Sequence, residues 1–475
     1  MRLKTLIAFL QIVNATILMF QVDFARAAEG DIDVSLLAEL KQSVQRTNNL
    51  PALINAISNN DLNTLALARD QVGKIDHFYN VRIDSIGKIK ITNQKSTGRC
   101  WLFTGLNVLR LNVIKQYALD NFEFSETYCF FYDQLEKANL FLEGIIDTRG
   151  LDISDRRVEW LFRNPIGDGG VWNMAIALVE KYGVIPKDVM PETYHSENTA
   201  SMSRLLRSRL RQGGLSIRTL SLQTKSMSRL REEKVKILAD VYKILAVSLG
   251  QPPETFVWRY RDKKNEIHES PRMTPLQFAA DVLPVSSFDQ VMLMNDPSRD
   301  YYELYEIEFD RNIHGKSNWT YINLPVNVMK EYAKQSLIDG QAMYFSCDVG
   351  KQLNSADGIL SVQNYDYESM YDIDLNMTKK ERIQTFDSGS SHAMTLVAVD
   401  TAADGTIKKW LLENSWGADK GHEGYLTMTD SWFDEYMFRL VVNKAYIPDD
   451  VLKILEQKPV KLHPWDPMYL PYEDQ

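Results

Sequence analysis

The hydrophobic pattern of the chain changes along its length, from helical spacing in the first half to strand-like segments in the last third. From Cys100 to Leu119, apolar residues recur three or four positions apart, which is typical of a helix with a buried face. The last third contains short apolar runs bounded by Gly, Asn or Asp, which predict strands at Ala342–Val349, His392–Val399, Lys408–Glu413 and Gly424–Met428. Because helices and strands are segregated in this way, we predict an α+β fold.

The remaining segments show weaker patterns. Residues 29–72 are predicted to be helical and polar, and Val81–Ile91 to be extended. A Gly-rich turn precedes a predicted helix at Val171–Lys181, and residues 202–249 are predicted to be helical and locally basic. Residues 250–325 are predicted to be irregular because they are rich in proline, including Pro252, Pro253, Pro271, Pro275, Pro284 and Pro297.

Length and composition exclude several classes of protein. The 475 residues, at about 150 per domain, provide roughly three domains of material. With 44% hydrophobic and 25% charged residues, the chain is not collagen-like, wholly disordered or a multi-span membrane protein. The net charge of −9 argues against a wholly basic nucleic-acid-binding protein. Three cysteines are too few for a disulfide framework in a chain of this length.

Residues 1–28 have the pattern of a secretory signal peptide. Arg2 and Lys4 give a charged start, Leu6–Phe20 is mostly apolar, and Ala25–Ala28 offers small residues at a cleavage point. A membrane anchor is the alternative, but three polar residues interrupt the apolar run: Gln11, Asn14 and Thr16. We therefore expect a protein exported to the periplasm or the extracellular space, with no membrane association after cleavage.

Cys100 stands at the predicted start of a helix, directly after a loop that contains Gly98. A helix N-terminus and a neighbouring imidazolium can lower a thiol pKa from about 8.5 to about 3.5–7.5, which would make Cys100 a nucleophile. Six residues earlier, Gln94 offers an amide N–H that, with a backbone N–H at the helix start, could stabilise an oxyanion. An inert, buried thiol is the alternative for Cys100, and it is the interpretation that we prefer for Cys129 and Cys347.

A base for this thiol is expected from the β-rich part. His392 opens a predicted strand, and Asn414 follows another strand 22 residues later. The Asn side-chain oxygen can accept a hydrogen bond from one imidazole nitrogen and leave the other facing the thiol, which is the orienting role in a catalytic triad. Trp416 could shield this bond from water. A structural histidine is the alternative for His392 taken alone.

Three sequence stretches together resemble papain-like cysteine peptidases, and more narrowly the bleomycin hydrolase and aminopeptidase C family. They are Gln94–Trp101, Ser391–Met394 and Glu413–Gly417, and four further stretches extend the resemblance over nearly all of the mature chain: Asn295–Pro297, Cys347–Lys351, Thr427–Phe433 and Pro464–Met468. The resemblance implies Cys100 as nucleophile, His392 as base and then acid, Asn414 as the orienting residue and Gln94 as the oxyanion donor. Secreted papain relatives carry a bridging Cys and a small residue where this chain has Thr97 and Arg99, so that disulfide is absent.

The resemblance also implies the architecture: a helical half and a β-barrel-like half with the active-site cleft between them. His392 and Asn414 lie 292 and 314 residues after Cys100, against about 130–150 in the papain type. A large, mainly helical insertion is therefore expected, and in the resembled family such insertions build a hexamer around a central chamber. The expected regions are a signal peptide (1–28), an N-terminal helical region (29–90), the helical half (91–200), an oligomerisation insertion (201–335), the β-rich half (336–458) and a C-terminal arm (459–475).

The C-terminal arm bears on specificity. In relatives the arm lies in the cleft, and its terminal carboxylate meets the α-amine of the substrate. The resemblance therefore implies an aminopeptidase. In this chain the terminal carboxylate belongs to Gln475. The seven residues after Met468 make a longer tail than the family pattern. A cysteine endopeptidase with an open cleft is therefore the alternative.

A second alternative is a nucleic-acid-binding protein that uses the ten Lys and Arg residues between Arg204 and Lys236. A solvated helical face is the simpler interpretation of this stretch. The chain has no Cys-x-x-Cys pair, no phosphate-binding Gly-rich loop and no His-Glu-x-x-His motif, so we expect no metal and no cofactor. Peptides are the expected substrates.

Overall fold

The computed structural model describes residues 30–83 and 88–468. The predicted signal peptide and the tail beyond Met468, with Gln475, lie outside the described residues. The chain forms two compact units. The first comprises the residues up to Leu67 together with Asp366–Asp374, and the second comprises Ala68–Tyr365 and the residues from Leu375 onward.

The first unit consists of short helices, which confirms the helical pattern predicted for this region. Asp33 and Asp61 begin two of them by accepting backbone N–H groups of the first turn. Neither of the two longer helices buries a residue. The helices are α2 (Val34–Gln45), α3 (Leu50–Asn59), α4 (Leu62–Ala66) and α14 (Tyr367–Tyr371).

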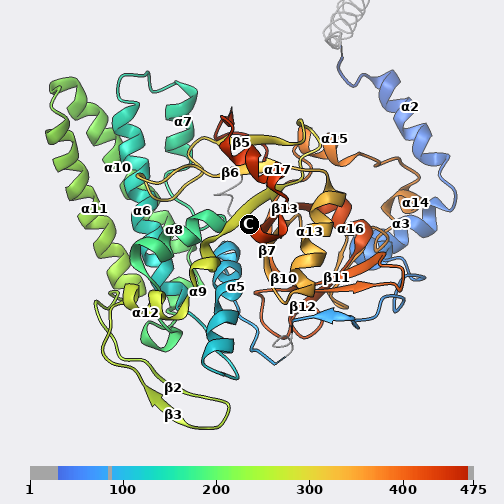
Figure 1. Cartoon of the computed structure of the whole chain (residues 1–475). Coiled ribbons are helices and arrows are strands. Elements are labelled where there is room, and N and C mark those ends of the chain that lie inside the picture. Colours follow the sequence, from blue (N-terminus) through green and yellow to red (C-terminus); the bar gives the residue numbers. More distant parts are fainter. Residues whose placement is uncertain (1–29, 84–87, 469–475) are drawn as a thin grey trace, which may run out of the picture. The chain divides into compact units, whose positions relative to one another are not determined.

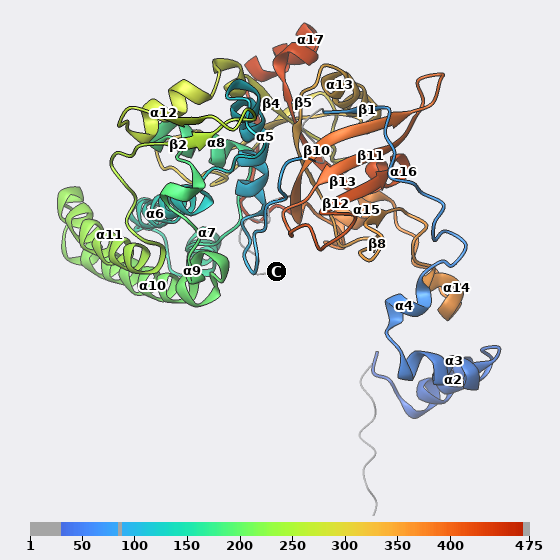
Figure 2. The same cartoon turned by 90° about the horizontal axis from the view of Figure 1, so that it is seen from below.

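The second unit contains a group of helices on one side of a large sheet (Figures 1 and 2). The helix predicted from Cys100 is α5 (Cys100–Gln116), and in both views it lies between the other helices and the strands. The other helices of this side are α6 (Glu126–Asp147), α7 (Arg156–Arg163), α8 (Trp172–Tyr182), α9 (Tyr194–Glu197), α10 (Ala200–Gln223), α11 (Met227–Leu249) and α12 (Pro275–Val282).

Twelve strands of the described chain form one sheet, in the order β14-β5-β6-β4-β13-β7-β10-β11-β12-β9-β8, with β1 paired to β10. All four strands predicted in the last third are present, as β7, β10, β11 and β12. The strands are β1 (Val81–Arg82), β4 (Gln290–Met294), β5 (Glu303–Ile307), β6 (Thr320–Asn323), β7 (Met343–Cys347), β8 (Leu353–Asn354), β9 (Ile359–Leu360), β10 (His392–Thr401), β11 (Ile407–Glu413), β12 (Tyr425–Thr429), β13 (Met437–Asn443) and β14 (Val460–Leu462). Helices α13 (Val326–Ile338), α15 (Lys379–Gln384), α16 (Asp430–Tyr436) and α17 (Asp449–Leu452) accompany the sheet.

The central strands are buried on both faces, between two hydrophobic cores. In β7, for example, Tyr344 belongs to the core shared with α5 and α6, whereas Phe345 belongs to the core on the other face. Successive side chains of a strand point to opposite faces, so the helix-facing positions of β7, β10 and β13 meet α5. This junction of the two cores holds the candidate site.

The prediction that residues 250–325 are irregular is wrong. They contain α12, the strands β4–β6 and an antiparallel hairpin, β2 (Arg259–Arg261) with β3 (Ile267–Glu269). In β4 the residues from Val291 to Met294 are all buried, because the strand has a core on each face, so the apolar–polar alternation of a half-exposed strand is missing. The extended segment predicted at Val81–Ile91 is a strand only at Val81–Arg82 in the described residues.

The basic stretch lies on α10 and α11, and several of its side chains bind groups of the same chain. Arg218 donates to the Thr148 and Leu151 carbonyls, and Lys234 bonds Glu143 at 2.6 Å. Arg209, Arg211, Arg231 and Lys236 also have partners within the chain. None of the described helices is both long and apolar enough to span a membrane.

Candidate active site

Cys100 is the first residue of α5, and the loop before it is held against the β-rich half. The backbone N–H of Gln94 donates to the Ser415 carbonyl at 2.8 Å, and Asn93 forms an isolated β-bridge with Trp416. The fold thus brings together two motifs that are far apart in the sequence, since 314 positions separate Cys100 from Asn414.

His392, the first residue of β10, is hydrogen-bonded to Asn414 as the sequence predicted. Its Nε2 lies 2.8 Å from Asn414 Oδ1. The same oxygen accepts the backbone N–H of Ser415 at 2.8 Å, which identifies it as the acceptor and Nε2 as the protonated nitrogen. Nδ1 is then left as the basic nitrogen of the ring. The Trp416 ring lies 4.8 Å from the imidazole, between centroids, and covers this pair.

Cys100, His392 and Gln94 line one cavity of about 90 Å³. Asn414 is not among the lining residues, so it lies behind the imidazole, in the orienting position. Cys129 and Cys347 are buried and do not line the cavity. Seven further lining residues come from the Gly-rich turn before α8, from the helix-facing side of β7 and β13, and from one loop: Gly169, Gly170, Val171, Tyr344, Ser346, Arg439 and Asp310. The remaining six lie close to Cys100 or His392 in the sequence: Thr97, Gly98, Trp101, Ser390, Ser391 and Ala393.

The Gln94 amide is fixed in orientation. Its Oε1 accepts the Ser415 hydroxyl at 2.7 Å, and its Nε2 donates to the Thr97 carbonyl at 2.7 Å. An amide nitrogen has two N–H donors, so one remains for an oxygen in the cavity. This geometry allows the oxyanion role that the family resemblance implies for Gln94.

Burial controls the electrostatics of the pair. It raises the pKa of the Cys100 thiol, and backbone N–H groups of Ala393, Trp101 and Cys100 itself lower it in part. Burial lowers the pKa of His392 to about 4, although the hydrogen bond that His392 donates to Asn414 acts to raise it. The thiol pKa thus shifts opposite to the sequence expectation, because loss of water outweighs the helix N-terminus. Both shifts favour the uncharged forms of the two side chains.

Arg99, directly before Cys100, has a structural role that sequence reasoning did not identify. Its side chain is fully buried, lies 2.9 Å from Glu192 and packs over the rings of Phe103 and Phe130. The ion pair joins the residue before α5 to Glu192. An arginine in a position that usually holds a small residue was the available signal, but nothing in the sequence identified Glu192 as its partner.

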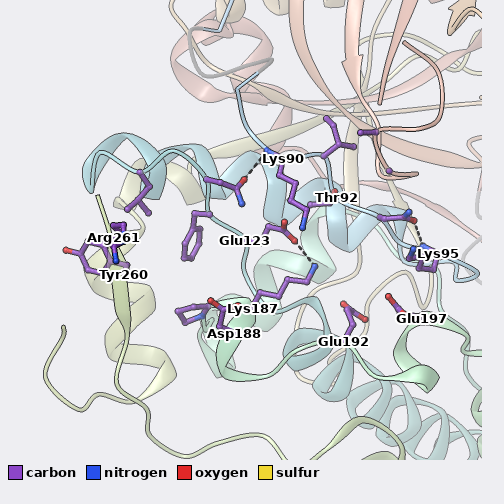
Figure 3. Close-up of a pocket in the computed structure, with 18 of the residues that line it drawn as sticks. Lys90, Thr92, Lys95, Glu123, Lys187, Asp188, Glu192, Glu197, Tyr260 and Arg261 are labelled. Carbon is purple, nitrogen blue, oxygen red and sulfur yellow. Dashed lines mark hydrogen bonds and ion pairs between the residues drawn. The ribbon is translucent and has the colours of Figure 1, made fainter. Parts of the chain in front are cut away.

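Glu192 also lines a second cavity, of about 820 Å³, beside the same loop (Figure 3). Charged residues of both signs face it, and Lys187 bonds Glu123 at 2.7 Å across it. The ion pair between Arg99 and Glu192 therefore borders a polar cavity beside the loop that precedes Cys100.

The last described residue of the tail is hydrogen-bonded to a residue that lines the cavity of Cys100 and His392. The Met468 carbonyl accepts a hydrogen bond from Arg439 Nη2 at 2.6 Å, and the Met468 side chain is buried. The tail beyond this point, including Gln475, lies outside the described residues.

Comparison with known proteins gives consistent matches. A family model described as the peptidase C1-like family matches residues 31–469. Bleomycin hydrolase of Homo sapiens is 39% identical over 437 residues, which cover 90% of this chain and 96% of that protein. Aminopeptidase C of Lactobacillus delbrueckii subsp. lactis is 36% identical over 399 residues, covering 83% and 88%. The crystal structure of PepW from Lactobacillus rhamnosis HN001 superposes with a TM-score of 0.89 at 35% identity and covers 93% of this chain and 99% of that one.

Proposed function

Because the chain belongs to the peptidase C1-like family and is a cysteine peptidase, we propose that Cys100, His392 and Asn414 are its catalytic residues. Its function is that of a cysteine aminopeptidase, in keeping with the relatives named aminopeptidase C and the PepW structure, and its papain-like fold is the one predicted. The observation that carries the assignment of residues is the His392–Asn414 hydrogen bond beside the cavity that Cys100 lines.

The reaction follows from this geometry. His392 Nδ1 takes the proton of the Cys100 thiol as the sulfur attacks the scissile carbonyl carbon, and the new oxyanion is met by Gln94 Nε2 and the Cys100 backbone N–H. The imidazolium then protonates the leaving amine, the C–N bond breaks and a thioester remains. Water, deprotonated by His392, attacks the thioester and releases the N-terminal residue together with the thiol.

The tail supplies the further part of the proposal. Met468 is bonded to a lining residue of the cavity, so the seven residues that follow start beside the cleft. We propose that they occupy it and that the Gln475 carboxylate limits cleavage to peptide N-termini. The alternative, an endopeptidase with an open cleft, predicts equal cleavage of free and N-acetylated peptides.

A peptide panel with free and acetylated N-termini tests both points, on the full chain and on a truncation after Met468. We expect free-amine peptides to be cleaved faster by the full chain, and the truncation to lose part of this preference. Cys100→Ser should lower kcat by about 10³-fold or more. Cys347→Ala is the matched control, because this buried thiol does not line the cavity. Appreciable turnover by Cys100→Ser would refute the assignment.

Export and assembly complete the proposal. We propose cleavage of a signal peptide near Ala27–Ala28, supported by the charged and apolar pattern of residues 1–28, and assembly into a hexamer, which the resembled family suggests. N-terminal sequencing of the protein from culture fractions and sedimentation analysis would test these two points. An intact Met1 in the mature protein, or a monomer at micromolar concentration, would contradict them.

A further inference from the structure

Asp310 is a buried acid that lines the cavity of Cys100 and His392. It lies in the loop between β5 and β6, where its backbone N–H donates to the Ile307 carbonyl and its own carbonyl accepts from Trp319. The side chain is fully buried, yet neither carboxylate oxygen has a hydrogen-bond partner in the described part of the chain. A buried carboxylate without donors is costly, and such a group calls for an explanation, of which a bound ligand is one.

Two cations act on this carboxylate through space, but neither is hydrogen-bonded to it. Burial raises the pKa of Asp310 to about 7, although Arg439 and Lys137 act on it through space to lower it. Lys137 is engaged by Asp133 at 2.7 Å and by the Gly167 carbonyl. Arg439 donates to the Met468 carbonyl and lies over the Trp319 ring. The cavity thus presents two free carboxylate oxygens where a donor could enter.

The same cavity holds the nucleophile. Tyr344 and Arg439 are close enough to interact electrostatically with both Cys100 and Asp310, so the acid and the thiol share their surroundings. In a substrate cleaved after its first residue, the α-nitrogen is two bonds from the scissile carbonyl carbon, or about 2.5 Å. The substrate amine must therefore enter the cavity that Asp310 lines.

We propose that Asp310 binds the α-ammonium group of the substrate and selects peptides with a free N-terminus. This inference rests on the proposed aminopeptidase function and adds a carboxylate fixed in the body of the protein to that of the tail. An ammonium group offers three N–H donors to the two empty oxygens. Because a charge-assisted bond of this kind is strong when buried, its loss should weaken binding by about 10- to 100-fold.

The test is Asp310→Asn in the full chain, with aminoacyl anilides that carry the α-amine and des-amino analogues that lack it. The isosteric amide keeps the shape of the side chain but loses the charge. We expect the preference for the free amine, measured as the ratio of kcat/KM values, to fall about 10- to 100-fold, mainly through KM. Glu126→Gln is the matched control: Glu126 is equally buried and has a pKa raised to about 7 by burial, but it does not line the cavity. Its ratio should stay at the wild-type value.

The outcomes separate this inference from the function on which it rests. If wild-type protein prefers the free amine and Asp310→Asn keeps the full preference, the role of Asp310 is refuted and the aminopeptidase function stands. If wild-type protein shows no preference, both fail. An N-acetyl-lysyl substrate distinguishes a side-chain ammonium: if only its cleavage depends on Asp310, the carboxylate binds lysine side chains and the inference is overturned. Truncation after Met468 combined with Asp310→Asn separates the two carboxylates, which should then contribute independently.

Discussion

The buried pair of Arg99 and Glu192 offers a quantitative test of how the nucleophile is held. Burial alone would raise the pKa of Glu192, but the Arg99 guanidinium outweighs it and holds that pKa below its ordinary value. The pair therefore contributes its full stability above about pH 4.5, and the contribution is lost as pH falls through the lowered pKa of the folded state. Measurements at pH 7 examine the pair in its fully ionised form.

Arg99→Met should destabilise the second unit, because it leaves Glu192 charged, with only 12% of its side chain exposed. Breaking one partner of a buried ion pair costs about 3–5 kcal/mol. For a unit of about 400 residues, the entropy of unfolding is about 0.8 kcal/mol/K, so Tm should fall by about 4–6 °C. Because Arg99 precedes Cys100, displacement of the thiol should also lower kcat/KM by about 10- to 100-fold.

A double-mutant cycle with Glu192→Leu completes this test. The double variant replaces both charges with apolar groups, so Tm should return to within about 1–2 °C of wild type. Calorimetry gives the Tm values, and hydrolysis of an aminoacyl anilide gives kcat/KM. If kcat remains low when Tm is restored, the pair positions the thiol as well as stabilising the fold. An unchanged Tm for Arg99→Met, or additive losses in the double variant, would refute the reasoning.

Three further predictions concern the cavity. Asn414→Ala leaves the Nε2–H of His392 without its acceptor, so kcat should fall about 10- to 100-fold in steady-state assays, with Tm within a few degrees of wild type. Because burial lowers the pKa of His392 to about 4, the base is uncharged above that value. With a des-amino substrate, which has no ammonium group for Asp310 to bind, kcat/KM should be lost only as pH falls through about 4, and a midpoint near 6.5 would contradict the buried imidazole. Burial raises the pKa of Asp310 to about 7, so this acid binds its proton more tightly in the folded than in the unfolded state. Its contribution to folding stability is therefore present at low pH and is lost as pH rises through 7. Asp310→Asn should have a higher Tm than wild type at pH 8 and the same Tm at pH 4, which calorimetry at the two pH values would check.

The residues that could be inferred from sequence are those that stand where an element begins or ends. Cys100 opens a helix, His392 opens a strand and Asn414 follows one, so short local motifs identify them even though 314 residues separate the first from the last. The structure brings Cys100 and His392 to one cavity, with Asn414 bonded behind the imidazole. Short motifs were sufficient to predict these three residues, because the role proposed for each depends on its residue type and on its position at the end of an element.

Elements buried on all sides were harder to predict. Helix α6 was not recognised, because its inner positions include Asp133 and Lys137, both almost fully buried and paired with each other across one helical turn. Charges at these positions interrupt the apolar stripe that marks an amphipathic helix. Strand β4 was missed for the opposite reason. It has a core on each face, so its sequence lacks the polar residues that alternate with apolar ones in a half-exposed strand.

Asp310 shows why a specificity residue can escape sequence reasoning altogether. Glu308, Asp310 and Arg311 follow one another in a loop whose composition is typical of an exposed surface, and acidic residues are among those least often buried. Only the packing of β5 and β6 against the helical half removes Asp310 from water and turns it toward the cavity of Cys100. The catalytic chemistry of this chain is therefore encoded in local motifs, whereas the charge that we propose selects its substrate arises from tertiary packing. It follows that relatives with the same motifs can differ in specificity through loops like this one, and that exchanging the residue at position 310 should alter amine selection without altering the chemical step.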